Sequence, residues 1–593
     1  MRLLPVCATV LGGTAFAAAH SLDGGMHKMR RGVEATTCRA HVRFTAASST
    51  GTGTATPPSS TATAASTTSL AASTTSAVST TATSSCAASA TATSSASASN
   101  PVILQGFEWY TEGGGTLYST LEEKAAELAE MGITMVWLPP STKAASGSGS
   151  VGYDAYDLWD LGEFDQKGTT ATKWGTITSF PLPELVSLIS TLKANNVSAL
   201  LDIVLNHKTG ADGTETYGAT EMNSTDRTKS VSELHDIEGQ TMFTFEGRGG
   251  KYSTMQWNHT HFTAVSYDAS TDSDGIFLTE GKEWSTAVST ENGNYDYLMF
   301  NDICYENDAV KEEILNWGEW VVNETGAEGF RIDAVKHFSY TFLSKFMETV
   351  RSRTNKPDLF GVGEFWTGSP SKLEDYLDSF TGGDFQVFDS PLHYNFYDAS
   401  QAGINFDLRT IFDDTLVASR PNNTVTLVDN HDTQPSQASE SWVGSTFKPL
   451  AYALILLREE GIPTVFAGDL WGINTTPAVS AMTQLSDFVK ARKWFGYGST
   501  TDYFDDASTV GWVRSGDANH DPVAVLMSIG TEEGSKKMQV EGAEEGEVYT
   551  DLLGWNTEEV TIEADGYATF KCPAQSVSIW TRTDARGREN TNN

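Results

Sequence analysis

Three carboxylate residues follow short apolar runs in the second half of this 593-residue chain. Asp333, Glu364 and Asp432 each stand at the end of such a run or a few residues beyond it. Carboxylates gathered in this way suit glycoside hydrolysis, because its transition state carries positive charge on the sugar and needs both an anionic partner and a proton donor. We therefore expect these residues to act on a glycosidic bond.

The neighbours of two of these carboxylates indicate different roles. Side chains alternate along a strand, so Arg331 and Asp333 lie on the same face, and a cation beside a carboxylate favours its ionised form. That form suits a nucleophile. Glu364 is followed by Phe365 and Trp366, and apolar surroundings favour a carboxylic acid that keeps its proton. The sequence thus predicts Asp333 as nucleophile and Glu364 as general acid and base.

The elements that must position these residues follow a repeated pattern from Pro101 onward. Short runs rich in β-branched and apolar residues alternate with amphipathic stretches, which is typical of parallel βα units. Eight such runs predict a closed (β/α)8 TIM barrel of the α/β class, whose strand ends would gather the catalytic residues at one mouth. The eight candidate strands are 102–106, 134–138, 199–205, 329–333, 359–364, 384–389, 424–429 and 462–467.

Two regions depart from the βα pattern. Residues 207–301 separate the third strand from the fourth, and a structureless loop of that length is rare, so we expect a small inserted β-rich domain. After residue 496, short β-like runs predict a C-terminal antiparallel β-sandwich. The expected domains are a signal peptide (1–19), a Ser/Thr/Ala-rich stalk (20–99), the barrel (100–206 and 302–496), the inserted domain (207–301), the sandwich (497–583) and a polar tail (584–593).

The N-terminal region predicts export. Residues 3–19 are apolar and rich in small side chains, as in a secretory signal. Residues 48–99 are almost wholly Ser, Thr and Ala, which cannot bury enough apolar surface to fold, so we expect a disordered, O-glycosylated stalk. The protein should be extracellular, with association to the cell wall as an alternative. N-glycans are compatible with sequons at Asn196, Asn223, Asn258, Asn323, Asn422 and Asn474.

Charge and cysteine usage exclude some classes of partner. The chain carries 76 acidic and 39 basic residues, and a formal charge of -37 repels phosphate backbones, so we expect no nucleic acid partner. No uninterrupted apolar run reaches about 20 residues, which predicts no membrane span. Five cysteines do not resemble a disulfide scaffold, although a Cys38–Cys86 pair stays open. We expect a monomer.

Four charged clusters, each at the end of a predicted strand, carry a resemblance to a known family. Residues 202–207, 329–337, 361–366 and 428–432 are similar, in order and spacing, to the signature regions of the α-amylase family, family 13 of the glycoside hydrolases. The resemblance extends over about residues 102–581. Residues 152–164 resemble the branch that contains bacterial liquefying amylases and related fungal enzymes.

The resemblance implies a role for each site residue. Asp333 would form the glycosyl-enzyme ester, Glu364 would act as acid and then base, and Asp432 would bind sugar hydroxyls and favour a distorted ring. The first two carboxyl groups would lie about 5 to 5.5 Å apart, as in retaining enzymes, so the products would be α-anomers. The implied substrate contacts are Arg331, which holds Asp333 ionised, His207 and His431 on the cleaved ring, Tyr156 stacked beneath it, and Lys336 and His337 on the leaving side.

The resemblance also implies a Ca²⁺ ion between the inserted domain and the barrel. Calcium prefers hard oxygen ligands. Its ligands would be the side chains of Asn206, Asp296 and Asp302 and the backbone carbonyl of His337. The bacterial relatives add a further metal cluster, but two of its Asp positions are Ser285 and Cys304 here. We therefore expect a single calcium site.

The leading hypothesis is a secreted α-amylase that cleaves α-1,4-glucosidic bonds of starch, glycogen and related α-glucans internally, with retention. An alternative on the same machinery is a transglycosylase that remodels cell-wall α-glucan, in which a sugar hydroxyl replaces water. Another is a non-catalytic glucan-binding wall protein. The intact set Asp333, Glu364 and Asp432 argues against the last alternative. No separate starch-binding module is evident at either end.

Overall fold

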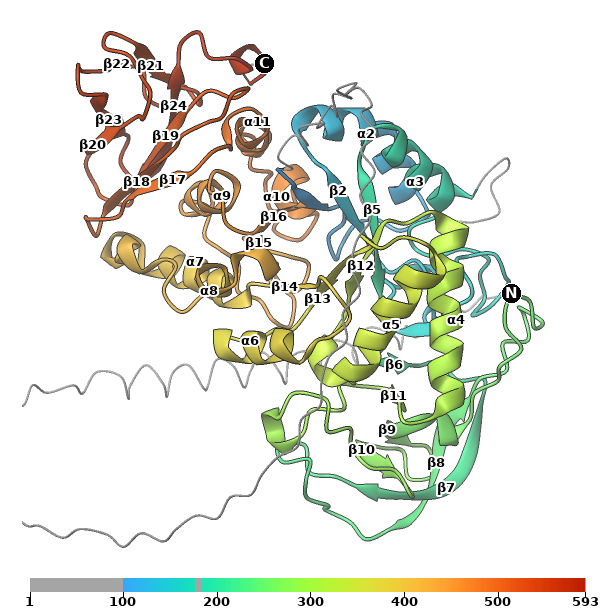
Figure 1. The fold of residues 1–593 in the computed structure, drawn as a ribbon. Helices are drawn as coiled ribbons and strands as arrows, with labels where there is room; N and C mark the ends of the chain where they lie inside the picture. The colour runs from blue at the N-terminus through green and yellow to red at the C-terminus, as the bar shows by residue number, and fades with distance from the viewer. Residues whose placement is uncertain (1–99, 176–182, 592–593) are drawn as a thin grey trace, which may run out of the picture. The chain divides into compact units, whose positions relative to one another are not determined.

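The computed structural model describes residues 100–175 and 183–591 (Figure 1). The expected signal peptide and stalk, and with them Cys7, Cys38 and Cys86, lie outside the described residues. Cys304 and Cys572, the cysteines of the described ranges, are buried and not bonded to each other. Within the described ranges, no helix is both long enough and apolar enough to cross a membrane.

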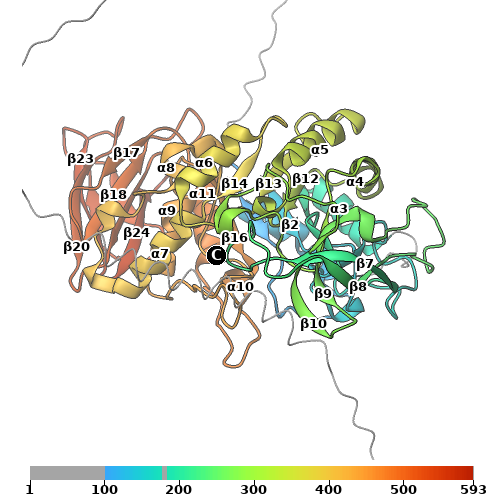
Figure 2. The same ribbon diagram turned by 90° about the horizontal axis from the view of Figure 1, so that it is seen from below.

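Eight parallel strands close into a barrel, which confirms the predicted fold (Figures 1 and 2). All eight predicted strands form, each shorter than its apolar run. In four of them the run ends in a carboxylate that lies beyond the strand, namely Asp333, Glu364, Asp389 and Asp429. Closure is made by β1, which pairs with both β2 and β16. The barrel strands are β1 (Ile103–Gln105), β2 (Met135–Leu138), β5 (Ser198–Ile203), β12 (Gly329–Ile332), β13 (Phe360–Gly363), β14 (Gln386–Phe388), β15 (Thr424–Leu427) and β16 (Ile462–Phe466).

The register of the central strands aligns the residues that form the site. Arg331 on β12 is level with Asp202 on β5 and with Val362 on β13. The residues that follow β12 and β13 are Asp333 and Glu364, so both carboxylates leave the barrel at the same level.

Helices lie between the barrel strands in the sequence, and most of them bury one apolar stripe, whereas α9 is buried on nearly all sides. In α4, Val310, Ile314, Trp317 and Val321 are all buried, at helical spacing. The helix begins where the Asn307 side chain accepts the Ala309 N–H, and it ends at a glycine with φ 79°. The helices are α2 (Leu117–Met131), α3 (Glu184–Ala194), α4 (Asp308–Thr325), α5 (Tyr340–Arg353), α6 (Pro370–Ser379), α7 (Ser390–Ala402), α8 (Leu416–Ser419), α9 (Lys448–Leu456), α10 (Ala467–Trp471) and α11 (Leu485–Phe495).

The long insertion between β5 and β12 folds as a small β-rich unit. Its strands form one six-stranded sheet in the order β6-β11-β9-β10-β7-β8, with a small core that includes Tyr217, Ile237 and Phe277. These strands are β6 (His207–Lys208), β7 (Gly213–Glu221), β8 (His235–Met242), β9 (Phe262–Asp268), β10 (Ser273–Thr279) and β11 (Asn301–Ile303). A further pair, β3 (Lys143–Ala144) and β4 (Ala155–Asp157), lies in the loop after β2.

The C-terminal region forms antiparallel β-structure. A six-stranded sheet and a two-stranded sheet share a core that contains Leu526, Met538, Phe570 and Trp580. The indole N–H of Trp512 donates to the Leu457 carbonyl of the barrel domain at 3.0 Å. The strands are β17 (Thr500–Tyr503), β18 (Thr509–Arg514), β19 (Val523–Ser528), β20 (Gly534–Gln539), β21 (Val548–Asp551), β22 (Glu559–Thr561), β23 (Tyr567–Cys572) and β24 (Ser576–Arg582).

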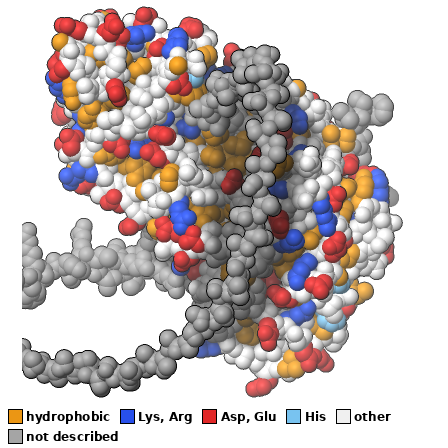
Figure 3. Space-filling view, viewed as in Figure 1, with side chains coloured by type: hydrophobic (Ala, Val, Ile, Leu, Met, Phe, Trp, Pro, Cys, Tyr) orange, Lys and Arg blue, Asp and Glu red, His pale blue; other side chains and the backbone are white. Residues whose placement is uncertain are grey.

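The surface mixes both signs of charge despite the acidic total. On the face shown in Figure 3, Lys and Arg side chains are interspersed among Asp and Glu side chains. The excess of acidic residues is therefore spread over this face among basic neighbours.

Candidate active site

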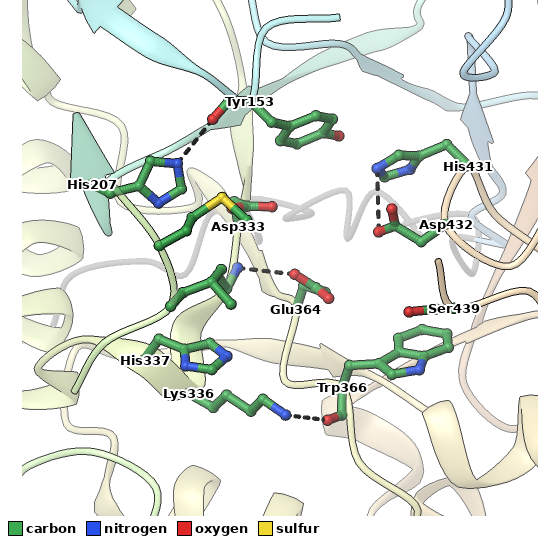
Figure 4. A pocket seen from close by; sticks show the side chains of 13 residues that line it. Tyr153, His207, Asp333, Lys336, His337, Glu364, Trp366, His431, Asp432 and Ser439 are labelled. Carbon is green, nitrogen blue, oxygen red and sulfur yellow. Dashed lines mark hydrogen bonds and ion pairs between the residues drawn. The ribbon is translucent and has the colours of Figure 1, made fainter. Parts of the chain in front are cut away.

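One pocket at the barrel mouth brings the predicted carboxylates together. Asp333, Glu364 and Asp432 all line it (Figure 4). Four of the predicted substrate contacts line the same pocket, namely His207, Lys336, His337 and His431. The loops after β5, β12, β13 and β15 supply these residues, as expected for the carboxyl ends of barrel strands.

A single buried guanidinium contacts two of the pocket carboxylates. Arg331 Nη1 donates to Asp333 Oδ1 at 2.7 Å, and Nη2 lies 3.3 Å from Glu364 Oε2. Nη1 also donates to Asp202 Oδ1 at 2.9 Å. Arg331 thus stands beside Asp333, as the strand alternation predicts, and it also holds Glu364 close to the same point.

Asp202 is a site residue whose role the sequence did not indicate. It is buried below the pocket, where it accepts bonds from the Tyr153 hydroxyl at 2.8 Å and from the Trp137 indole at 3.0 Å. Burial raises the pKa of Asp202 to about 6, against the opposing effect of Arg331. Asp202 and Asp333 together hold Arg331 from two sides. Only the pairing of β5 with β12 could have revealed this, because 129 positions separate Asp202 from Arg331.

Glu364 has the environment that an acid catalyst needs. Burial, with the charges of Asp333 and Asp432, raises the pKa of Glu364 to about 8, and Arg331 opposes the rise. The backbone N–H of Ala334 donates to Glu364 Oε2 at 2.9 Å. Ala334 has φ 52°, a left-handed conformation that costs energy for a residue with a Cβ. This turn brings the N–H to the carboxyl group, so the backbone of β12 fixes the position of Glu364.

Two of the three histidines that line the pocket, His207 and His431, are held by fixed partners. His207 Nε2 lies 2.9 Å from the Tyr153 carbonyl, and His431 Nδ1 lies 2.9 Å from Gln105 Nε2. His431 Nε2 lies 3.4 Å from Asp432 Oδ2 (Figure 4). The rings are therefore oriented before any ligand binds.

The expected stacking residue, Tyr156, does not line this pocket. Its hydroxyl donates to Asp212 at 2.8 Å, and Lys167 Nζ lies 3.9 Å from its ring centre, in a separate cavity. Tyr153 lines the carboxylate pocket instead (Figure 4). Tyr156 is the middle residue of β4, whereas Tyr153 lies two residues before the strand begins at Ala155, in the segment that lines the mouth. The structure therefore places Tyr153, and not Tyr156, beside the carboxylates, and stacking by Tyr156 stays a prediction.

Lys336 and His337 stand on the pocket wall next to Asp333 in sequence. Lys336 Nζ donates to the Trp366 carbonyl at 2.9 Å and pairs with Glu291 at 3.3 Å. Glu291 also binds Lys372 at 2.7 Å. This acidic residue of the inserted domain thus ties two lysines of the barrel domain, a contact that sequence spacing alone could not predict.

The residues expected to bind calcium present oxygens that lack hydrogen bonds. Asn206 Oδ1 and both carboxylate oxygens of Asp302 are buried and accept no hydrogen bond of standard geometry. Burial and the charge of Asp296 raise the pKa of Asp302 well above its usual range, although Thr263 favours the charged form. Burial likewise raises the pKa of Asp296 to about 7. Such acceptors are costly to bury unless a cation satisfies them, so the donor set fits a hard metal ion.

The two substituted positions of the further metal cluster have other partners. Lys282 Nζ lies 3.4 Å from Cys304 Sγ, and the Ser285 N–H donates to Asp296 Oδ2 at 2.6 Å. Among the described residues, no group of three or more His, Cys, Asp and Glu side chains is arranged to hold a metal. The residues expected to bind calcium contribute only two carboxylates, together with an amide and a backbone carbonyl.

Comparison with known proteins gives the same family as the site geometry. A family model described as "Alpha amylase, catalytic domain" matches residues 111–494. The glucan 1,4-alpha-maltohexaosidase of Bacillus sp. (strain 707) is 44% identical, over 81% of this chain and 92% of its own. The cytoplasmic alpha-amylase of Escherichia coli (strain K12) is 42% identical, over 81% and 98%. A solved Anoxybacillus alpha-amylase shares the fold, with a TM-score of 0.55 and 15% identity over 81% of this chain and 97% of its own. The chain belongs to the α-amylase family of glycoside hydrolases.

Proposed function

We propose that this protein is a secreted α-amylase that hydrolyses internal α-1,4-glucosidic bonds of starch and related α-glucans with retention of anomeric configuration. The observation that carries the proposal is the arrangement around Arg331. One buried guanidinium contacts both Asp333 and Glu364, while the pKa of Glu364 stands at about 8. At neutral pH this gives one carboxylate for attack and one carboxylic acid for proton donation.

In the first half of the reaction, Glu364 donates its proton to the glycosidic oxygen as the bond to the anomeric carbon breaks. Asp333 Oδ attacks that carbon and forms an ester with the sugar, and the shortened glucan leaves as an alcohol. Arg331 and Asp202 keep Asp333 oriented during this step. Asp432 and His431 bind hydroxyls of the sugar ring and favour its distorted form.

In the second half, Glu364 is a carboxylate and removes a proton from a water molecule. The water oxygen attacks the anomeric carbon and the ester bond to Asp333 breaks. With the proton taken from water Glu364 is a carboxylic acid again, and Asp333 is a carboxylate. Two inversions give net retention. Tyr153, His207 and Trp366 line the pocket around the ester and would shield it from solvent.

We also propose that one Ca²⁺ ion binds Asn206, Asp296, Asp302 and the carbonyl of His337. The unsatisfied oxygens of Asn206 and Asp302 support this, because a cation would offset the cost of burying them. These ligands come from the end of β5, the inserted domain and the segment after β12. A bound ion would therefore join the inserted domain to the barrel and hold His337 on the pocket wall.

Secretion is part of the proposal and rests on residues 1–19, whose composition is that of an export signal. N-glycans at the sequons and a monomeric state belong to the same proposal. Asn196, in a turn, and Asn474, in a segment without regular structure, both have exposed side chains. Sequencing the N-terminus of the protein recovered from culture medium tests export, and an intact Met1 in cell-retained protein would contradict it.

Product analysis tests hydrolysis against transfer. With soluble starch and an excess of an α-glucan acceptor, hydrolysis gives oligosaccharides shorter than the substrate. If a sugar hydroxyl replaces water in the second half of the reaction, products longer than either starting glucan accumulate. Size-resolved chromatography of the reaction mixture separates these outcomes, and longer products as the main species would contradict the proposal.

A further inference from the structure

A buried cluster of charges lies outside the pocket, behind the loop that carries Asp432. Lys448, the first residue of α9, pairs through Nζ with Asp429 Oδ2 at 2.8 Å and with Asp469 Oδ1. The side chains of Lys448, Asp429 and Asp469 are 6%, 0% and 2% exposed. Tyr452 donates its hydroxyl to Asp469 Oδ2 at 2.7 Å. Buried ion pairs add little net stability because desolvation offsets their attraction, so this cluster calls for a further explanation.

Hydrogen bonds connect this cluster to the backbone of Asp432. Asp429 Oδ1 accepts the Thr433 hydroxyl at 3.0 Å, and the same hydroxyl oxygen accepts the Asn430 N–H at 3.0 Å. Asn430 Oδ1 in turn accepts the N–H groups of Asp432 at 2.8 Å and of Thr433 at 2.9 Å. The turn from Asp429 to Thr433 is thus fixed by its own polar side chains, and Lys448 binds the first of them.

The same ammonium also holds the segment that follows the turn. Asp429 accepts the Val443 N–H at 3.3 Å, and the Ser441 N–H donates to the Thr433 carbonyl at 3.1 Å. Lys448 Nζ lies 3.0 Å from the ring centre of Trp442. Lys448 therefore organises both the turn with Asp432 and the chain that packs behind it, although it does not line the pocket.

We propose that Lys448 is a positioning residue for Asp432, acting through Asp429, Thr433 and Asn430. The inference rests on the proposed role of Asp432 in binding the distorted sugar ring. A carboxylate that stabilises a transition state must be held within a fraction of an ångström, and a shift of about 1 Å can cost on the order of 100-fold in rate. Lys448 holds the Asp429 carboxylate in place, and Asp429 accepts the hydrogen bond of Thr433. The hydrogen bonds of the turn then fix the position of the Asp432 backbone.

The Thr433 hydroxyl offers the sharpest test, because it is the link between the charges and the turn. Thr433→Val keeps the shape and all charges but removes both hydrogen bonds, whereas Thr433→Ser keeps the hydroxyl. Thr426→Val is the matched control: Thr426 lies buried on the same strand end, and its hydroxyl has no hydrogen-bond partner. Lys448→Met removes the ammonium with little change of length. Asp432→Asn gives the reference effect.

We expect Thr433→Val and Lys448→Met to lower kcat on soluble starch at least tenfold with less than a threefold change in KM, while Thr433→Ser and Thr426→Val stay within about threefold of wild type. The alkaline limb of the pH profile of kcat/KM should also move to lower pH in Thr433→Val. A displaced Asp432 would no longer help Asp333 to raise the pKa of Glu364 against the opposing charge of Arg331. A purely structural role would lower the melting temperature and leave this limb in place.

The outcomes distinguish the positioning role of Lys448 and Thr433 from the proposed role of Asp432. If Asp432→Asn impairs the enzyme but Thr433→Val matches Thr426→Val in kcat and pH profile, the positioning role is overturned and the role of Asp432 stands. If Asp432→Asn itself retains wild-type kcat, the proposed role of Asp432 is wrong. The proposal that Lys448 positions Asp432 for catalysis is then overturned as well. If Lys448→Met does not fold, the Thr433 and Thr426 variants decide the question.

Discussion

Tyr153 stacks on His431, with ring centroids 5.1 Å apart and ring planes within 2° of parallel. The Tyr153 hydroxyl also donates to Asp202, which holds Arg331. One side chain thus contacts both His431, which is proposed to bind the sugar, and the acid that holds Arg331 beside the proposed nucleophile. The wall it forms is the place where a flat sugar face would meet an aromatic ring.

The first prediction concerns this wall. Tyr153→Ala should lower kcat/KM on soluble starch at least tenfold, about 1.4 kcal/mol of transition-state stabilisation, because it removes the ring and the bond to Asp202. Tyr153→Phe should lose less, since the ring remains. Tyr156→Phe is the matched control and should stay within about threefold. Steady-state kinetics of the three variants check this, and a loss for Tyr153→Ala no larger than that for Tyr156→Phe would contradict the role of Tyr153.

The difference between the two tyrosines shows where sequence reasoning ends. The eight strands could be predicted because each barrel strand is a continuous apolar run bounded by polar loops, and Asp333 and Glu364 could be placed because they directly follow such runs. The turn geometry of the loop before β4 determines which of its side chains point into the barrel mouth. The pattern of apolar and polar residues does not predict that geometry. The position of Tyr153 therefore became known only from the three-dimensional fold.

The same limit applies to contacts made between distant strands. Asp202 was visible in the sequence as part of a charged cluster, but its bond to Arg331 depends on the register between β5 and β12. Glu291 lies within the insertion, and its pairing with Lys336 and Lys372 depends on how the inserted domain meets the barrel. Residue types and spacing could predict the reaction, but not these supports of the catalytic groups.

The second prediction concerns the two central carboxylates. Asp333→Asn and Glu364→Gln are nearly isosteric, so both variants should fold, yet each should keep less than about a tenth of the wild-type kcat. Asp333→Asn removes the attacking oxygen and Glu364→Gln removes the proton donor. Circular dichroism and thermal unfolding provide the control for folding. A variant with wild-type melting behaviour and more than a tenth of the activity would show that its residue has been assigned wrongly.

The third prediction concerns pH. Glu364 must be protonated to act as the acid, and its pKa is about 8, so kcat/KM should fall as the pH rises through about 8. The charge of Asp432 contributes to that pKa, so Asp432→Asn should move the alkaline midpoint of its residual activity to lower pH. Assays between pH 6 and 10, with recovery of activity after return to pH 6, check both statements. A midpoint that moves upward in this variant would contradict the stated cause.

The fourth prediction concerns calcium. A metal that binds the folded protein alone stabilises it by mass action, so a chelator should lower the melting temperature and added calcium should restore it. Asp302→Asn should weaken this response because it removes a buried anionic ligand, whereas Asp274→Asn, a control at an exposed position of β10 in the same inserted domain, should respond like wild type. Thermal unfolding with and without chelator measures the effect. A melting temperature that is indifferent to chelator, with no calcium in elemental analysis, would contradict the site.

The central claim is that Asp333 forms a covalent intermediate which Glu364 then resolves, and the anomeric configuration of the first product tests it most directly. Proton NMR of a soluble starch digest, recorded before mutarotation, should show new reducing ends as α-anomers, because two inversions restore the original configuration. The Asp333 and Glu364 carboxyl groups, which share Arg331, are expected to act together in the first displacement, and Glu364 then acts as the base in the second. New reducing ends that emerge as β-anomers would require a single displacement by water and would contradict the mechanism.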